Sequence, residues 1–291
     1  MPHAIRSRLR ALLCSTDMDV QAQGLELAVS LEPPIRDVLR GLSLSGIDLS
    51  GRRLRGWDLR GLFMPTARMD GVDLVGADLR DAALSGVRMR GASLSGCRLD
   101  GATLTDADLS DADLRRARWK RPPALDRVLL CGADLRGLML RGLALSESDL
   151  SFARLEGCDL GSVLDSPVSL LGARIDAAAI RRSGWGPDAL SRFAALGGLL
   201  PPGHPTPPVT ASVQLSLQGR DLRGRSFAGH RWRGTLTTVD LRDVDLRGIV
   251  ADGLALHGCD LRGADLSGAS LRWVRFDSDC DLRGADLRGA D

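Results

Sequence analysis

The sequence has few aromatic residues and little net charge. It contains no tyrosine, and its five tryptophans and five phenylalanines make up 3% of its 291 residues. Because proteins that bind single-stranded nucleic acid usually stack the bases on aromatic side chains, this composition argues against such a site. The 39 basic and 37 acidic residues leave a net charge of +2, which argues against a basic arm for nucleic acid or membranes. We therefore expect neither direct nucleic-acid binding nor membrane binding.

Long apolar runs are also absent from the sequence. No stretch approaches the roughly 18 apolar residues that indicate a membrane-spanning helix. Residues 1–13 are basic but lack the uninterrupted apolar segment of a signal peptide. The sequence therefore predicts a cytoplasmic protein.

The short motifs of nucleotide binding and nucleophilic catalysis are missing as well. The sequence has no P-loop, no G-x-S-x-G and no G-x-G-x-x-G after a buried strand. None of the four histidines has a cysteine or carboxylate at ligand-like spacing, and the six cysteines include no C-x-x-C pair. Aspartates are numerous because a short unit repeats, so their number does not indicate an acid–base pair. We expect no enzyme activity, no cofactor and no metal site.

What the sequence does contain is a large apolar residue at every fifth position. In an extended segment, residues two apart lie on the same side. In the first series, a second apolar residue, usually small, precedes each large one by two positions, except at Arg52, and Gly or Asp often follows by two. Gly and Asp can adopt the positive φ of a tight turn, so each pentad can place two apolar side chains inside and turn a corner. Successive coils must then stack to bury their apolar residues. The first uninterrupted series is Leu44, Leu49, Leu54, Leu59, Met64, Met69, Leu74, Leu79, Leu84, Met89, Leu94, Leu99, Leu104, Leu109, Leu114 and Trp119.

These pentads resemble those of the pentapeptide-repeat proteins. The residues that carry the resemblance include Ala77-Asp78-Leu79-Arg80 and Ala264-Asp265-Leu266-Ser267-Gly268. The resemblance implies a mainly β fold, a right-handed quadrilateral β-helix with four pentads per coil. Some members of this family imitate duplex DNA and protect type II topoisomerases from inhibitors, so the resemblance also names a candidate partner.

Residues 1–40 do not follow the five-residue spacing. Ile5, Leu9 and Leu13 fit an amphipathic helix, and two further helices are expected between Val20 and Leu31 and between Ile35 and Leu39. We interpret this segment as a helical cap on the first coil, because terminal repeats need protection. The alternative is a helical module that binds a partner.

The rest of the chain divides into three segments. Residues 41–181 form a first β-helix, with one inserted residue at Arg121-Pro122-Pro123, Asp165 in an inner position, and a short helix that starts at Asp176 and ends near Gly184. Residues 182–212 contain a helix from Pro187 through Leu196 and a proline-rich linker. Residues 213–291 form a second β-helix, which loses one residue before Leu236 and gains one after Phe276.

Three smaller features complete this organisation. Four cysteines (Cys97, Cys158, Cys259 and Cys280) occupy the smaller inner position, so we interpret them as core residues. His230 also falls on an inner position, which we interpret as a locally irregular coil rather than a ligand site. The sequence stops within a pentad at Asp291, and an uncovered coil exposes unpaired backbone groups. Either two such ends meet in a homodimer through the C-terminal coil, or the chain was cut short.

One side of the first predicted β-helix carries no charge, although 26% of all residues are charged. This candidate interaction face consists of Ser43, Ser45, Phe63, Pro65, Ala83, Ser85, Thr103 and Thr105. It is expected to continue at Ala144, Ser146, Leu164 and Ser166, with a matching face in the second β-helix at Ser216, Gln218, Thr235, Thr237, Ala255 and His257. Such a face can bind a partner or a second copy. The alternative is that the 187–199 helix or the linker covers it.

Another side of the second β-helix alternates in charge. Its residues are Asp221, Arg223, Asp240, Arg242, Asp260, Arg262, Asp281 and Arg283. Each exposed pair contributes little stability. We expect this ladder to serve solubility and the alignment of the coils, since a shift would bring like charges together.

These observations favour a non-catalytic scaffold or protein-interaction protein that presents one face of a rigid β-helix. The alternative is a DNA-mimicking topoisomerase (gyrase) protection protein that confers inhibitor resistance. Mimicry of DNA requires a strongly acidic rod, whereas residues 41–121 have 14 basic and 11 acidic residues and residues 213–291 have 12 of each. The acidic positions Asp58 and Asp78 are followed in the same stack by Arg98 and Arg118.

Overall fold

The structure is a computed structural model of the whole chain. It describes residues 3–13, 15, 17, 19, 20, 23, 24, 27, 44–201, 227, 232 and 234–291. The predictions for Ser43, the third N-terminal helix, the proline-rich linker, Ser216, Gln218, Asp221, Arg223 and His230 lie outside these residues. The chain divides into two compact units, one of Met1–Leu190 with Leu199–His204 and one of Ser191–Gly198 with Pro205–Asp291.

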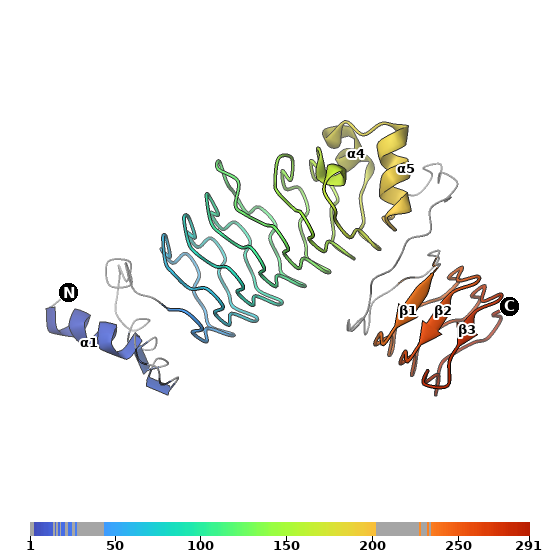
Figure 1. The fold of residues 1–291 in the computed structure, drawn as a ribbon. Coiled ribbons are helices and arrows are strands. Elements are labelled where there is room, and N and C mark those ends of the chain that lie inside the picture. Colours follow the sequence, from blue (N-terminus) through green and yellow to red (C-terminus); the bar gives the residue numbers. More distant parts are fainter. Residues whose placement is uncertain are drawn as a thin grey trace. The chain divides into compact units, whose positions relative to one another are not determined.

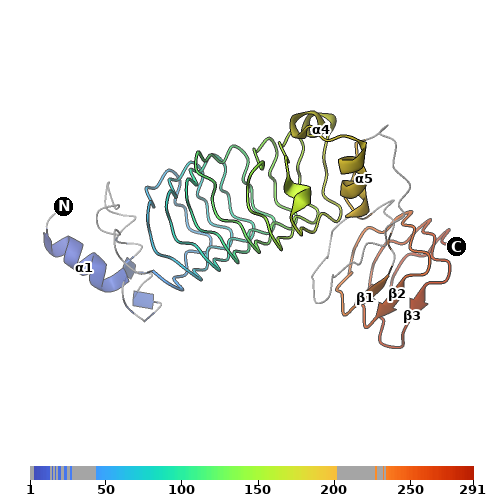
Figure 2. The same ribbon diagram turned by 45° about the horizontal axis from the view of Figure 1, so that its top comes forward.

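The first unit consists mainly of stacked coils of twenty residues. Phe63 pairs in parallel with Ala83, and Ala83 with Thr103, so each position meets its counterpart four pentads later. In the regular coils, the N–H of a large inner residue donates to a carbonyl of the next coil, as from Leu74 to Ser93 at 2.9 Å. Figures 1 and 2 show these coils as successive rungs from blue to green. Four pentads per coil is the arrangement that the resemblance implied.

Each corner of a coil is a hydrogen-bonded turn. The N–H of Ala77 donates to the carbonyl of Leu74 at 2.9 Å, and Gly76 between them has φ 70°. A type II turn requires a positive φ at this third residue, which glycine adopts without steric cost. Non-glycine residues take the same conformation at other corners, including Thr66 and Asp81, both at φ 57°. The five-residue spacing therefore follows from one turn per pentad.

The inner residues form a dry core along the axis of the coils. Leu74, Leu79, Leu84 and Met89 all have 0% exposure. The smaller inner residues are buried too, and the Cys97 thiol donates to the Leu74 carbonyl at 2.8 Å. Cys158 and Cys259 are likewise buried, whereas Cys280 is half-buried. The prediction of an apolar axis is confirmed.

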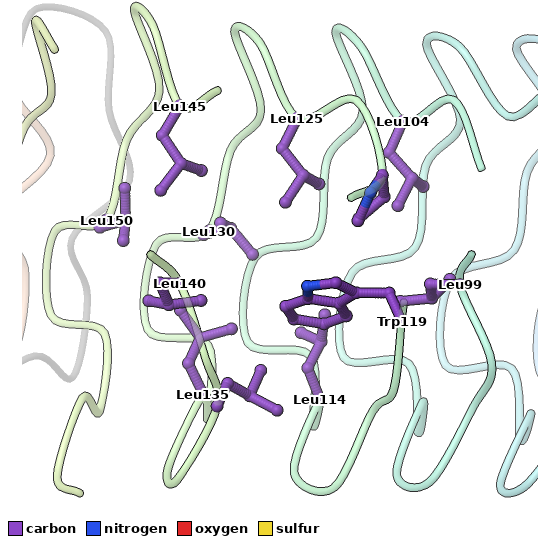
Figure 3. Close-up of a pocket in the computed structure, with 12 residues that line it drawn as sticks. Leu99, Leu104, Leu114, Trp119, Leu125, Leu130, Leu135, Leu140, Leu145 and Leu150 are labelled. Carbon is purple, nitrogen blue, oxygen red and sulfur yellow. The ribbon is translucent and has the colours of Figure 1, made fainter. Parts of the chain in front are cut away.

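The coil that contains Arg121–Pro123 has one extra residue. Thr103 pairs with Ala124, and the N–H of Gly101 donates to the Arg121 carbonyl at 3.2 Å, so the stack continues across the insertion. Figure 3 shows Trp119 directed into the axis among leucines, beside a cavity of about 20 Å³ whose lining is wholly apolar. The insertion is a bulge inside one stack, as predicted.

The last part of the first unit departs from the regular pentads. The 3-10 helix η1 (Val163–Asp165) buries Leu164 and leaves Asp165 exposed. The expectation that Asp165 would be inside and Leu164 outside is therefore wrong. The tighter turn shifts the inner position by one residue, so the apolar side chain is buried and the carboxylate keeps its hydration.

Helices α4 (Ala177–Ser183) and α5 (Pro187–Ala195) follow the coils. The Asp176 side chain accepts a hydrogen bond from the N–H of Ala179, and Gly184 ends α4 with φ 68°. Both helices were expected from the sequence and are confirmed. Leu199 then pairs in parallel with Arg174 as one more rung.

At the N-terminus, α1 (His3–Leu13) is the amphipathic helix that the sequence predicts. Leu9 and Leu13 have 0% exposure. The described residues at 19–20, 23–24 and 27 are also helical, within the segment expected for the second helix. Gly24 lies so close to α1 that an added Cβ would be 2.9 Å from the Leu12 Cβ.

The second unit repeats the coil design. Three short parallel strands, β1 (Thr235–Thr237), β2 (Ala255–His257) and β3 (Arg275–Phe276), form one sheet in the order β1-β2-β3. The residue that is lost before Leu236 shortens the hydrogen-bond spacing between coils. The Trp232 N–H donates to the carbonyl of Val250, 18 residues later, whereas the Leu241 N–H donates to the carbonyl of Asp260, 19 residues later. The gained residue is visible in the pairing of Asp260 with Asp281. No helix in the described part of the chain is long and apolar enough to cross a membrane.

Candidate interaction surfaces

The structure brings together most of the predicted interaction face in the first unit. We call these residues the uncharged side, and they are Ser45, Phe63, Pro65, Ala83, Ser85, Thr103 and Thr105. The backbone ladder sets their spacing, because Phe63, Ala83 and Thr103 pair in succession and the Ser45 hydroxyl donates to the Pro65 carbonyl at 3.3 Å. Phe63 is 51% exposed, so the side presents one large apolar group among small residues.

The uncharged side ends earlier than the sequence suggested. The rung after Thr103 and Thr105 holds Ala124 and Asp126, since the Asp106 N–H donates to the Asp126 carbonyl at 3.1 Å. A direct continuation from Thr105 to Ser146 is therefore wrong. The inserted residue shifts the five-residue spacing by one position but does not remove the rung of Ala124 and Asp126. This rung carries the Asp126 carboxylate. Further along, Leu164 is buried and offers no apolar surface there.

The matching face of the second unit is not charge-free. It is the outer surface of β1, β2 and β3, where Ala255 pairs with Arg275. His257 Nδ1 lies 3.1 Å from a carboxylate oxygen of Asp277 in the next coil. The hydrogen bond from the Gly258 N–H, helped by Cys280 and His257, lowers the pKa of Asp277 to about 2. The coil period of twenty residues is the signal that could have found this pair in the sequence. Within the described ranges, no group of three or more His, Cys, Asp or Glu residues could hold a metal ion.

The charge ladder of the second unit is a chain of ion pairs. Arg242 binds both carboxylate oxygens of Asp240, at 2.9 and 2.6 Å, and its Nε lies 3.5 Å from Asp260 in the next coil. Arg262 repeats this arrangement on Asp260 and lies 3.6 Å from Asp281. Each guanidinium thus holds the aspartate of its own pentad and approaches the next one. A role in aligning the coils stays a prediction.

One strongly charged surface was missed in the sequence. Three successive coils carry six basic residues and a single carboxylate on and beside the side whose inner residues are Leu99, Trp119 and Leu140. We call this the basic side, and it consists of Arg98 and Asp100, then Arg116, Arg118, Lys120 and Arg121, then Met139 and Arg141. The signal was the run Arg115-Arg116-Ala117-Arg118-Trp119-Lys120-Arg121, which charge counts over long segments conceal.

Comparison with known proteins identifies the repeats. The sequence matches the family model described as "Pentapeptide repeats" in eight copies, at residues 39–91, 82–118, 125–161 and 240–277, which is just over half of the chain. No curated protein matches the sequence significantly.

Several solved structures of pentapeptide repeat proteins align with this chain. HetL, a pentapeptide repeat protein involved in heterocyst differentiation regulation in the cyanobacterium Nostoc, is 22% identical and aligns over 88% of this chain and 92% of its own, with a TM-score of 0.33. A trypsin-treated form of QnrB1, a plasmid-mediated fluoroquinolone resistance protein, is 18% identical and aligns over 80% of this chain and 91% of its own, with a TM-score of 0.35. A pentapeptide repeat protein from the thylakoid lumen of Arabidopsis thaliana is 28% identical and aligns over 48% of this chain and 77% of its own, with a TM-score of 0.18. At these TM-scores the backbones do not superpose over their length, so the likeness carries no functional information.

Proposed function

The chain belongs to the pentapeptide-repeat family, and from that premise we propose that it is a non-catalytic scaffold whose uncharged side binds a protein partner. The observation that carries the proposal is a stack of seven uncharged positions on a chain that is otherwise rich in charge. Phe63, half exposed at 51%, supplies the apolar centre that protein interfaces favour. Around it, small side chains leave room for a partner to approach.

The backbone supports such a role by holding the surface rigid. Every rung of the uncharged side is tied to its neighbours by coil-to-coil hydrogen bonds, as from the Met64 N–H to the Ala83 carbonyl at 2.9 Å. Side chains on a pre-organised backbone lose less conformational entropy when a partner binds. A flat and rigid side therefore suits recognition better than chemistry, which needs converging ionisable groups.

The proposal is tested by placing charge on the uncharged side. The double substitution Ala83→Arg and Ser85→Arg should abolish capture of the partner from a lysate of the native host. Ser93→Arg with Ser95→Arg is the matched control, because these half-buried residues flank Leu94 two sides further along the coil. Thermal melts should be equal for the two variants. The proposal fails if both variants capture the same proteins as the unmodified chain.

A second candidate function is protection of a type II topoisomerase by imitation of duplex DNA. It is supported by membership of the family and by the aspartates at positions 58 and 78, which stack directly. It is opposed by the arginines that pair with them, since Arg60 and Arg80 each bind the aspartate of their own pentad at 2.6 Å. A cytoplasmic location, which either function would suit, stays a prediction.

Helix α4 and the adjoining residues Asp176 and Trp185 are proposed to cap the last regular coil of the first unit. The Asp176 carboxylate accepts from the Gly157 N–H at 2.9 Å, and the Ser183 hydroxyl accepts from the Leu160 N–H at 2.9 Å. Arg182 donates to the Gly157 carbonyl at 2.8 Å, and Trp185 to Gly161 at 2.9 Å. These side chains take the place of a further coil at an otherwise open edge. Asp176→Ala should speed hydrogen exchange at the Gly157 amide, and an unchanged rate would refute the cap.

The C-terminal coil is proposed to bind a second copy of the chain. Its inner residues are the least covered of the core, with Phe276 38% and Leu287 45% exposed. Burial of these apolar groups against an identical coil would favour a symmetric dimer. Sedimentation velocity should show a dimer that Phe276→Arg dissociates. If the unmodified chain sediments as a monomer, the proposed dimer is refuted.

A further inference from the structure

The basic side has an excess of positive charge that the described residues do not neutralise. Arg98 and Arg141 pair with Asp78 and Asp159 of adjoining rungs, and Arg121 pairs with Asp81 two rungs away. Arg116, Arg118 and Lys120 are exposed, and their side chains form no ion pair with any residue that the structure describes. Three unneutralised cations therefore lie along one side of one coil, with a single carboxylate, Asp100, in the adjoining rung.

We propose that the basic side binds a short acidic segment of a partner protein. Arg118 and Lys120 occupy alternate residues of an extended stretch, so their backbone positions are about 7 Å apart. Arg116 lies at the corner just before them, with φ 60°. An extended peptide with acidic residues at every second position has the same spacing. Such a segment could run along the coil and pair one carboxylate with each cation, and Arg98 and Arg141 would add charge from the two neighbouring coils.

The size of the basic side favours a peptide over nucleic acid. Three coils span about 10 Å along the axis, and the stretch from Arg116 to Arg121 is at most about 17 Å long. Specific DNA interfaces bury at least about 600 Å² of protein surface, several times more than this area provides. Aspartates also border it, with Asp78 and Asp81 before it and Asp159 after it. A long polyanion would meet these carboxylates, whereas a peptide of about five residues would not.

The only aromatic residue of this stretch is unavailable for stacking on bases. Trp119 lies between Arg118 and Lys120 in sequence, but Figure 3 shows its ring inside the coil among leucines. Its inward direction is also what turns Arg118 and Lys120 outward, because alternate residues of an extended stretch face opposite ways. The inward direction of the tryptophan thus fixes the positions of the two cations. The site does not depend on the uncharged side, so either can fail without the other.

The test uses a fluorescent peptide of five residues that alternates glutamate and serine, and the same peptide with glutamine in place of glutamate. The full chain should bind the glutamate peptide and not the glutamine peptide, and added salt should weaken binding. Replacing Arg116, Arg118 and Lys120 together by glutamine should weaken binding about tenfold, because each exposed ion pair contributes modestly. The matched control replaces Arg242, Arg262 and Arg283 by glutamine, which removes the same charge from arginines that already hold aspartates. It should change binding less than about twofold.

Lys120 allows a second measurement on the unmodified protein, since it is the only lysine in the sequence. A carbodiimide activates a carboxylate, and an amine then displaces the resulting urea to form an amide. Treatment of the complex should join the peptide to Lys120, as mapped by mass spectrometry. The proposal is overturned if the glutamate peptide does not bind, if the control loses as much affinity as the triple variant, or if the peptide couples elsewhere. Tighter binding of a DNA oligonucleotide of equal charge would also overturn it, in favour of nucleic acid.

Discussion

At the scale of single residues, the third position of each corner decides how much backbone strain the coil carries. Glycine takes the left-handed conformation freely, whereas a residue with a Cβ loses about 1–2 kcal/mol there. Eleven described non-glycine residues adopt it nonetheless, among them Arg116 on the basic side. Such positions are retained in a sequence when the side chain has another use, or when the strain is small against the stability of the stack.

Trp273 is a position where removal of this strain should stabilise the protein. It has φ 61° and is 86% exposed, so it makes few contacts that a substitution would lose. Trp273→Gly should stabilise the second unit relative to Trp273→Ala by about 0.5–1 kcal/mol, after the entropy that glycine gains in the unfolded chain is counted. Urea denaturation of the two variants measures the difference. Equal stability would show that the corner is not strained.

Asp281 should give a pH dependence of known sign. The hydrogen bonds from Arg283 lower the pKa of this carboxyl to about 2 in the folded protein, below an ordinary value near 3.9. A lowered pKa stabilises the fold above the ordinary pKa, so this contribution should disappear as the pH falls from about 4 to 2. Carbon-13 NMR should find a midpoint about 2 for Asp281, and Arg283→Gln should raise it. Arg288→Gln, which removes the partner of Asp286, should leave the Asp281 midpoint unchanged.

At the scale of the pentad, an inner and an outer leucine should differ sharply in their contribution to stability. Leu84 has 0% exposure, so Leu84→Ala leaves a cavity in the axis and should cost about 2–5 kcal/mol in the free energy of unfolding. Leu129, which points outward and is 41% exposed, is the matched control in the same unit. Leu129→Ala should cost about 0.5 kcal/mol or less. Urea denaturation followed by circular dichroism compares the two, and equal costs would contradict the inward direction of the five-residue series.

The pentads show which parts of the fold a sequence can predict. Leu79 and Leu84 were placed correctly because an unbroken spacing of five leaves one way to bury both residues. Leu164 was misplaced because a single 3-10 turn shifts the inner position by one residue, and no spacing rule reveals that shift. Asp126 was overlooked on the uncharged side because the inserted residue made a whole rung easy to miss. His257 and Asp277 meet only through stacking, although their separation equals the length of one coil.

The surfaces were harder to predict than the core because both sign and pairing matter. The run of cations before Pro122 is plain in the sequence, but only the coil geometry shows which of them hold aspartates. Arg115 binds Asp113 at 2.8 Å and is neutralised, whereas Arg118, three residues later, faces the basic side. Some side chains bind backbone groups that a further coil would otherwise bind, as the Ser183 hydroxyl does at the Leu160 N–H. These side chains follow no repeating pattern, so the sequence does not reveal them.

At the scale of the whole molecule, the distribution of charge separates the two candidate functions. Proteins that imitate DNA must present a continuous acidic surface, because the phosphate backbone carries one charge about every 1.7 Å of helix axis. In this chain the aspartates are interleaved with arginines that bind them, and the basic side begins at Arg98. A topoisomerase surface that binds DNA is itself basic and would be repelled there.

We therefore expect no protection of a type II topoisomerase. In a gyrase supercoiling assay with a fluoroquinolone, added protein should leave the inhibition unchanged. Reversing the basic side, with Arg116, Arg118 and Lys120 all changed to glutamate, lengthens the acidic surface and tests the reason behind the expectation. If charge alone prevents mimicry, this variant should protect more than the unmodified chain. Protection by the unmodified chain at low concentration would identify a topoisomerase as the partner. It would then favour topoisomerase protection over the scaffold function.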